Sequence, residues 1–86
     1  MSGWCVYMIL CSDGSLYTGI STDAERRFHQ HCSGKGAKYF RRCRPLRLVF
    51  TETGHSRGSA VRREAAIKNL SRPLKLQLAA GPEAGY

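Results

Sequence analysis

Acidic residues are scarce in this 86-residue chain, which has six of them against fourteen lysines and arginines. The formal net charge of +8 favours a polyanionic partner, either nucleic acid or an anionic membrane surface. No acid occurs between Glu25 and Glu52, where eight basic residues gather: Arg26, Arg27, Lys35, Lys38, Arg41, Arg42, Arg44 and Arg47. The alternative interpretation of this excess is a solvated positive surface that only aids solubility.

Long hydrophobic runs are also missing. The longest apolar stretch, Trp4–Cys11, is too short for a signal peptide or a membrane span, so we expect a cytoplasmic protein without a membrane partner. The four cysteines lack CxxC pairs and zinc-finger spacing with the histidines. We therefore expect them to be reduced, mostly buried and structural, without a metal role: Cys5, Cys11, Cys32 and Cys43.

The length allows one domain, which we place at residues 1–80, with residues 81–86 as a C-terminal tail. A domain of this size has no room for a deep interior cavity, so a functional site is expected in a surface groove. No small-molecule cofactor motif is present, and the oligomeric state cannot be inferred from the sequence.

Turn signals and apolar periodicity predict three strands and three helices in the order ββαβαα. The expected strands are Trp4–Cys11, Leu16–Ile20 and Arg47–Thr53, the first two forming a hairpin around residues 12–15. The expected helices run over residues 23–32, from a Ser56 or Ser59 cap to about Leu70, and from Pro73 to the stop at Gly81. The fold class is therefore α/β (α+β), with a small, mainly antiparallel sheet flanked by helices.

Two details of this prediction can be checked against a structure. Thr22 and Glu25 match a capping box, with Thr22 as the N-cap of the first helix. Simple alternation places Leu48 and Phe50 on one face of the third strand and Val49 on the other. The segment between residues 37 and 45 is basic and expected to be irregular.

Several residues have side chains that could take part in catalysis or binding, although each also has an ordinary structural interpretation. Tyr7 and Tyr17 are typical strand residues, and Gly19 within a strand indicates a bulge or a close approach of backbone. Arg27 and His31 lie four residues apart, so they share a helix face and suit a phosphate clamp or a solvent-facing basic pair.

Glu64 stands out because it adjoins an apolar arc on its predicted helix. In that position it suits a metal-binding carboxylate. The alternative is an exposed ion pair with Lys68 one turn later.

Together these residues resemble the GIY-YIG nuclease superfamily. The segments 5–7 (Cys-Val-Tyr) and 17–19 (Tyr-Thr-Gly) stand where the two named motifs would be, followed by Arg27, His31 and Glu64 at the family's spacing. Further short matches run over nearly the whole chain and resemble the small stand-alone bacterial YhbQ-like group. Two positions depart from some members, which have lysine where Ile20 stands and asparagine where Leu76 stands.

The resemblance implies a metal-dependent endonuclease that hydrolyses phosphodiester bonds with one divalent cation, Mg²⁺ or Mn²⁺, held by Glu64. It implies catalytic roles for Tyr7, Tyr17, Arg27, His31 and Glu64, without deciding which tyrosine acts as the base. It favours DNA over RNA as partner and suggests a role in DNA repair or recombination. The expected nucleic-acid-binding residues are Gly19, Arg26, Lys35, Lys38, Arg41, Arg42 and Arg44.

Two other function classes remain open at the level of sequence. One is a nucleic-acid-binding module on a GIY-YIG scaffold with little or no cleavage, which the departures at Ile20 and Leu76 favour. The other is a basic protein–protein adaptor, which salt-sensitive nucleic acid binding would distinguish from the first two.

Overall fold

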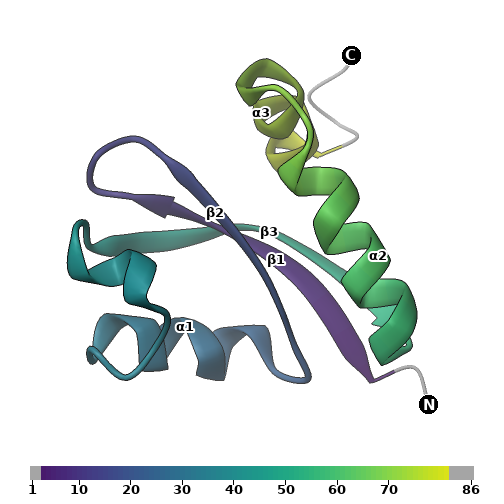
Figure 1. Ribbon diagram of the computed structural model, residues 1–86, viewed down its shortest axis with the longest axis horizontal. Coiled ribbons are helices and arrows are strands. Elements are labelled where there is room, and N and C mark those ends of the chain that lie inside the picture. Colours follow the sequence, from purple (N-terminus) through teal and green to yellow (C-terminus); the bar gives the residue numbers. More distant parts are fainter. Residues whose placement is uncertain (1–2, 82–86) are drawn as a thin grey trace.

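A computed structural model describes residues 3–81, and it contains the predicted element order (Figure 1). A short 3-10 helix, η1, adds structure to the segment that was expected to be irregular. In chain order the elements are β1 (Trp4–Cys11), β2 (Leu16–Ser21), α1 (Ala24–Cys32), η1 (Lys38–Arg41), β3 (Pro45–His55), α2 (Arg57–Lys68) and α3 (Arg72–Ala80).

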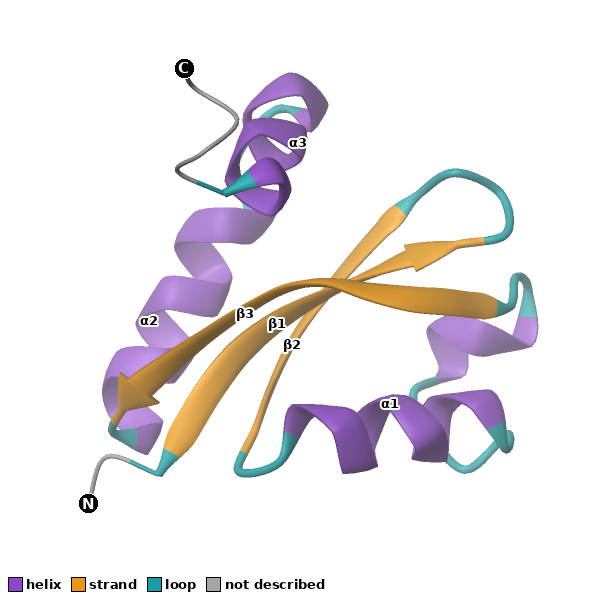
Figure 2. Cartoon of the chain, turned by 180° about the vertical axis from the view of Figure 1, so that it is seen from behind, coloured by secondary structure: helices purple, strands orange, loops and turns teal. Residues whose placement is uncertain are grey.

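The three strands form one antiparallel sheet in the order β2-β1-β3, so β1 is the central strand. Helix α1 covers one face, while α2 and α3 lie on the other (Figures 1 and 2). The expected sheet with flanking helices is confirmed. Its layering gives the central strand two buried faces, which explains why β1 reads as a continuous apolar run.

Alternation along β1 divides the core into two clusters. Tyr7 and Ile9 pack with Phe28 of α1, whereas Val6 and Met8 pack with Ile67 of α2. This division follows the period of two in an extended strand. Tyr7 therefore points toward α1, which is the side that carries Arg27 and His31.

The predicted faces of β3 were right for Leu48 and Val49 and wrong for Phe50. Leu48 packs on the α1 side of the sheet, but both Val49 and Phe50 pack on the α2 side. The register with β1 shifts between the pairs Met8–Phe50 and Ile9–Leu48, where β3 has one residue more than β1. A bulge of this kind interrupts strict alternation, so counting by twos fails beyond it.

The N-cap of α1 was also assigned to the wrong residue. Asp23, and not Thr22, has the extended backbone of a cap, and its side chain accepts a 3.0 Å hydrogen bond from the Arg26 amide. The Ser21 hydroxyl in turn accepts a 3.0 Å bond from the Asp23 amide, which fixes the entry into the helix. An aspartate is favoured there by its charge as well as its reach.

The later helices begin close to the expected positions. Ser56 caps α2 by accepting a 3.1 Å hydrogen bond from the Ser59 amide, and Pro73 lies in the first turn of α3. Gly81 ends α3 with a φ of 79°, a conformation that favours glycine. Beyond Gly81, the predicted tail lies outside the described residues. Within residues 3–81 no helix is both long and apolar enough to cross a bilayer.

Thr18 in β2 is expected to limit stability. Its side chain is only 3% exposed, and its hydroxyl has no hydrogen-bond partner among residues 3–81. Replacing it by valine removes an unpaired buried polar group while keeping the shape, so Thr18→Val should raise the free energy of unfolding by about 1 kcal/mol. Urea titration of the variant would measure this.

The exposed Thr51 on β3 provides the matched control, because Thr51→Val changes no buried hydroxyl. A loss of stability in Thr18→Val would show that the Thr18 hydroxyl has a partner in solution.

Candidate active site and basic surface

Tyr7 lies at the centre of the candidate site, 1% exposed, with its ring crossing the backbone of β2. Its cross-strand partner is Gly19, and a Cβ at Gly19 would lie 2.5 Å from the Tyr7 hydroxyl. Only glycine leaves room for the tyrosine in this position. The glycine predicted to allow a close approach of backbone to phosphate thus accommodates a buried side chain.

The Tyr7 hydroxyl lies 2.9 Å from Nε2 of His31 on α1. The other ring nitrogen of His31, Nδ1, accepts a 3.1 Å hydrogen bond from the Ala37 amide. Because the amide can only donate, the neutral ring carries its proton on Nε2 and donates it to the Tyr7 oxygen. The acidic hydrogen of Tyr7 is thereby left free to point elsewhere.

Gly36 makes this arrangement possible. A Cβ at Gly36 would lie 1.8 Å from Nδ1 of His31 and 2.8 Å from its Cα. The loop after α1 passes this close to the imidazole only because residue 36 has no side chain.

Burial dominates the ionisation of both groups. It lowers the pKa of His31 from 6.5 to about 4, and the nearby Arg27 guanidinium lowers it further. Burial also raises the pKa of Tyr7 to about 12, with a smaller contribution from Tyr17, while the Arg27 guanidinium opposes the rise. In the protein alone, burial outweighs the effect of the Arg27 charge on the pKa of Tyr7.

Tyr17 lies beside this pair in an aromatic cluster. Its ring centre is 5.4 Å from His31 and 4.8 Å from Phe40 of η1. Phe40 also stacks 4.5 Å from His31. Half-buried Tyr17 has no hydrogen bond to His31, so the structure distinguishes the two tyrosines that sequence could not separate.

Arg27 lies one turn before His31 on α1, with partial exposure. Its guanidinium donates a 2.9 Å hydrogen bond to the Gln30 side chain, which leaves further donors for a phosphate. Its position one turn before His31 puts its charge on the same helix face, and that charge lowers the pKa of both His31 and Tyr7.

Glu64 lies on α2, which contacts β2 on the other side of the sheet. Its carboxylate adds to the raised pKa of Tyr7, after the larger effects of burial and Tyr17. It also forms the expected ion pair with Lys68, at 3.2 Å. Lys68 is exposed, and such a pair is weak enough for a cation to displace.

A second carboxylate holds α2 on the sheet. Glu52 of β3 accepts hydrogen bonds of 3.0 and 3.3 Å from Arg63 and one of 2.7 Å from His55. Burial raises the pKa of Glu52, but these partners together outweigh it and hold the pKa below its usual value. Arg63 precedes Glu64 directly, so the Glu52 contacts help to position the candidate metal ligand.

The predicted nucleic-acid-binding cations are all exposed. They lie on α1, which also carries His31, or on the segment between α1 and β3: Arg26, Lys35, Lys38, Arg41, Arg42 and Arg44. The two departures from the family pattern lie elsewhere, with Ile20 in the core on the α2 side and Leu76 exposed on α3.

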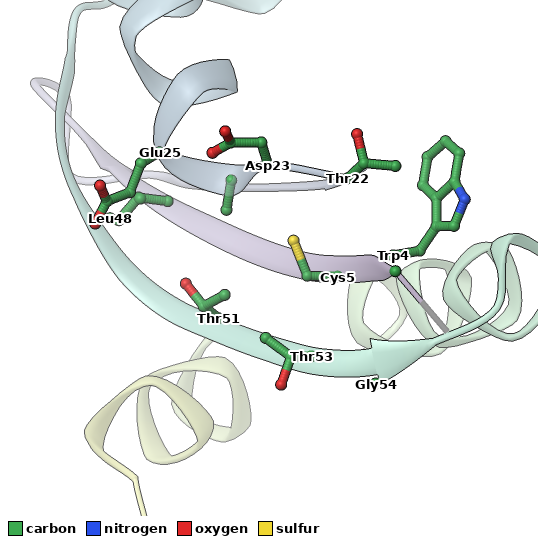
Figure 3. A pocket seen from close by; sticks show the side chains of 11 residues that line it. Trp4, Cys5, Thr22, Asp23, Glu25, Leu48, Thr51, Thr53 and Gly54 are labelled. Atoms are coloured by element: carbon green, nitrogen blue, oxygen red, sulfur yellow. The ribbon is translucent and has the colours of Figure 1, made fainter. Parts of the chain in front are cut away.

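A groove of about 620 Å³ opens near the start of α1 and the ends of β1 and β3, and it contains none of the predicted catalytic residues (Figure 3). Asp23 and Glu25 line it together with Trp4 and two threonines of β3. Two of the chain's six acids at its rim make it unfavourable for a phosphate backbone.

Sequence reasoning missed the supporting residues of the site. Gly36 and Phe40 were assigned only to a helix end and a basic loop, and Gln30 was not singled out. The run Gly34-Lys35-Gly36 is a signal that could have pointed to this loop. One glycine is enough to end a helix, so the second glycine indicates an additional constraint on the backbone. The hydrogen bond from Ala37 to His31 spans six residues and has no signal in the sequence.

The sequence is similar to those of known proteins. The GIY-YIG catalytic domain matches residues 3–77. A UPF0213 protein of Cronobacter sakazakii is 51% identical over 81 residues, which are 94% of this chain and 85% of that protein. A UPF0213 protein of Halalkalibacterium halodurans is 52% identical over 73 residues, which are 85% of this chain and 78% of that protein.

Two solution NMR structures share the fold. One is a UPF0213 protein from Bacillus halodurans, with a TM-score of 0.57, 48% identity and coverage of 93% of this chain and 88% of that one. The other is a protein from E. faecalis, with a TM-score of 0.58, 44% identity and coverage of 90% and 81%. The chain therefore belongs to the GIY-YIG catalytic-domain family and is similar to its small UPF0213 members.

Proposed function

We propose that this domain is a metal-dependent endonuclease that hydrolyses phosphodiester bonds in nucleic acid, with DNA as the preferred substrate, in the cytoplasm. The observation that carries the proposal is the buried 2.9 Å contact between Tyr7 and His31, with Arg27 one turn earlier on the same helix. Glu64 lies on α2, which contacts β2 from the other face of the sheet. A structural role alone does not require a buried tyrosine hydroxyl paired with a neutral imidazole one turn from an arginine.

Tyr7 is the group that acts on the attacking water. Because His31 donates to the Tyr7 oxygen, the tyrosine keeps its own proton free and its oxygen is stabilised if that proton leaves. With a pKa of about 12, Tyr7 orients water in the free protein and needs added positive charge to accept a proton. Tyr17 shields the pair and lines the approach to it.

Arg27 binds a non-bridging phosphate oxygen through the donors that Gln30 leaves free. The exposed cations of α1 and of the following segment hold the strand by its phosphates. Each phosphate contact on duplex DNA should add about 0.9 to the slope of log affinity against log salt.

Glu64 fits a divalent cation because it offers a partly exposed carboxylate with one weak partner. Mg²⁺ and Mn²⁺ are bound by one or two carboxylates with water and substrate phosphates, so a single protein ligand is sufficient. The cation supplies stabilisation of the charge that develops on the phosphate and on the leaving oxygen.

Replacing Glu64 by glutamine is expected to reduce cleavage about 100-fold or more, because several kcal/mol of charge stabilisation depend on the cation. The test is a panel of labelled single-stranded, duplex and branched DNA and of RNA, with Mg²⁺, Mn²⁺ or EDTA. Glu25→Gln is the matched control, since Glu25 is an exposed acid on α1 away from the tyrosines.

Absence of cleavage by the unaltered protein on every substrate, with salt-sensitive binding intact, would refute the nuclease proposal. The pairing of Glu64 with Lys68 favours that second candidate, a nucleic-acid-binding module on a GIY-YIG scaffold. If binding too were absent at low salt, both proposals would fail.

A further inference from the structure

The fold brings together two cysteines that are far apart in the sequence. Cys11 ends β1, Cys43 follows η1, and Asp13 lies in the hairpin turn. One donor atom from each, two sulfurs and a carboxylate oxygen, lie within 4.8 Å of one another. We propose that Cys11, Asp13 and Cys43 form a zinc-binding site that ties the basic segment after α1 to the hairpin.

The backbone holds these three residues in place independently of any ion. The Ser12 amide donates a 2.8 Å hydrogen bond to the Arg44 carbonyl, and the Arg44 amide donates one of 2.8 Å to the Ser12 hydroxyl. The neighbours of all three ligands are thus paired directly. This preorganisation distinguishes the cluster from cysteines that merely share a core.

The donor atoms are also available. The hydrogen bonds from both sulfurs to backbone carbonyls are long, at 3.8 Å from Cys11 to Ile9 and 3.8 Å from Cys43 to Tyr39. One oxygen of Asp13 accepts two hydrogen bonds from Ser15, at 3.0 and 2.6 Å. The other oxygen accepts none within the part of the chain that the structure describes.

The ligand chemistry selects zinc. Thiolates bind zinc at about 2.3 Å and carboxylates at about 2.0–2.2 Å, so tetrahedral ligands are separated by roughly 3.5–3.8 Å. Donors within 4.8 Å therefore need to approach by only about 1 Å. Two sulfur ligands disfavour Mg²⁺ and Mn²⁺, which prefer oxygen, so this site is chemically distinct from that of Glu64.

Charge around the cluster suits the loaded site. Two thiolates, one carboxylate and Zn²⁺ sum to a single negative charge, and Lys38 and Arg42 line the same hollow as Asp13 and Cys43. Cysteine binds zinc as a thiolate, so loading must release the thiol protons. Zinc affinity should accordingly increase with pH.

Binding would stabilise the wall of the candidate active site. Segment 38–43 carries Tyr39 and Phe40, whose rings pack 5.2 and 4.8 Å from Tyr17. Zinc bound between Cys43 and the hairpin would restrain this segment from outside the candidate active site. The zinc proposal does not depend on cleavage, because its readouts are metal content and stability.

The test uses the full chain, reduced and stripped of metal, titrated with Zn²⁺ and separately with Co²⁺. We expect one zinc per chain, a thiolate-to-cobalt charge-transfer band, and a rise in Tm of about 10 °C or more at a hundredfold excess over Kd. Cys11→Ser and Cys43→Ser should abolish the band. Cys32→Ser is the matched control, because Cys32 is exposed and lies outside the cluster.

Asp13→Asn covers the case in which the buried serine variants fail to fold. Asp13 is exposed, so the variant should fold and bind zinc about tenfold or more weakly. Absence of the cobalt band in the reduced unaltered protein would overturn the proposal. So would a band that survives both cysteine substitutions, or one that Cys32→Ser removes.

Discussion

Acidification from pH 7 to pH 4.5 is expected to lower the free energy of unfolding by about 2 kcal/mol through His31 alone. The imidazole is 2% exposed, and burial together with Arg27 lowers its pKa from 6.5 to about 4. Below pH 6.5 His31 binds a proton in the unfolded chain, whereas in the folded protein it stays neutral until the pH approaches 4. The stability that depends on neutral His31 is therefore complete above pH 6.5 and is lost as the pH falls toward 4.

Urea unfolding at several pH values between 7 and 4.5 measures this slope. His31→Gln should flatten it, whatever the variant's stability at neutral pH. His29→Gln is the matched control, because His29 is an exposed histidine on the same helix. Equal slopes in the unaltered protein and His31→Gln would show that His31 is protonated without cost, and the proposed donor role toward Tyr7 would fail with it.

Most of the fold was predictable because local signals and the global arrangement agree. The apolar run of β1, the turn at residues 12–15 and the serine cap of α2 each specify an element that the structure contains. The errors arose where one residue changes the local rule. The bulge in β3 rotates Phe50 to the other face, and Asp23 displaces Thr22 as the cap because it has the extended backbone and a charged acceptor.

The candidate site was predictable only in part, for a different reason. Spacing placed Arg27 and His31 on one helix face, and resemblance added Tyr7, Tyr17 and Glu64. Neither signal reports contacts between residues distant in sequence. The imidazole tautomer depends on an amide six residues later, and the pairing of Cys11 with Cys43 depends on how the segment after α1 returns to the hairpin.

Replacing Gly36 by alanine is expected to reduce the free energy of unfolding by about 2–4 kcal/mol. The added Cβ would overlap Nδ1 of His31 at 1.8 Å and approach its backbone at 2.8 Å, so a small rotation of the ring cannot relieve it. Moving the loop away would break the hydrogen bond from Ala37 and leave a buried nitrogen unpaired. Urea titration measures the loss.

Gly58→Ala is the matched control, because it makes the same change in the first turn of α2, where the nearest atom is 3.5 Å away on a flexible arginine. It should be neutral or stabilise the protein by up to about 1 kcal/mol. A readout specific to His31 comes from ¹⁵N NMR of its ring, which reports the tautomer in each variant. If Gly36→Ala keeps both the stability and the Nε2–H tautomer, then the loop is not what orients His31. The hydrogen bond that leaves the Tyr7 proton free would need another origin.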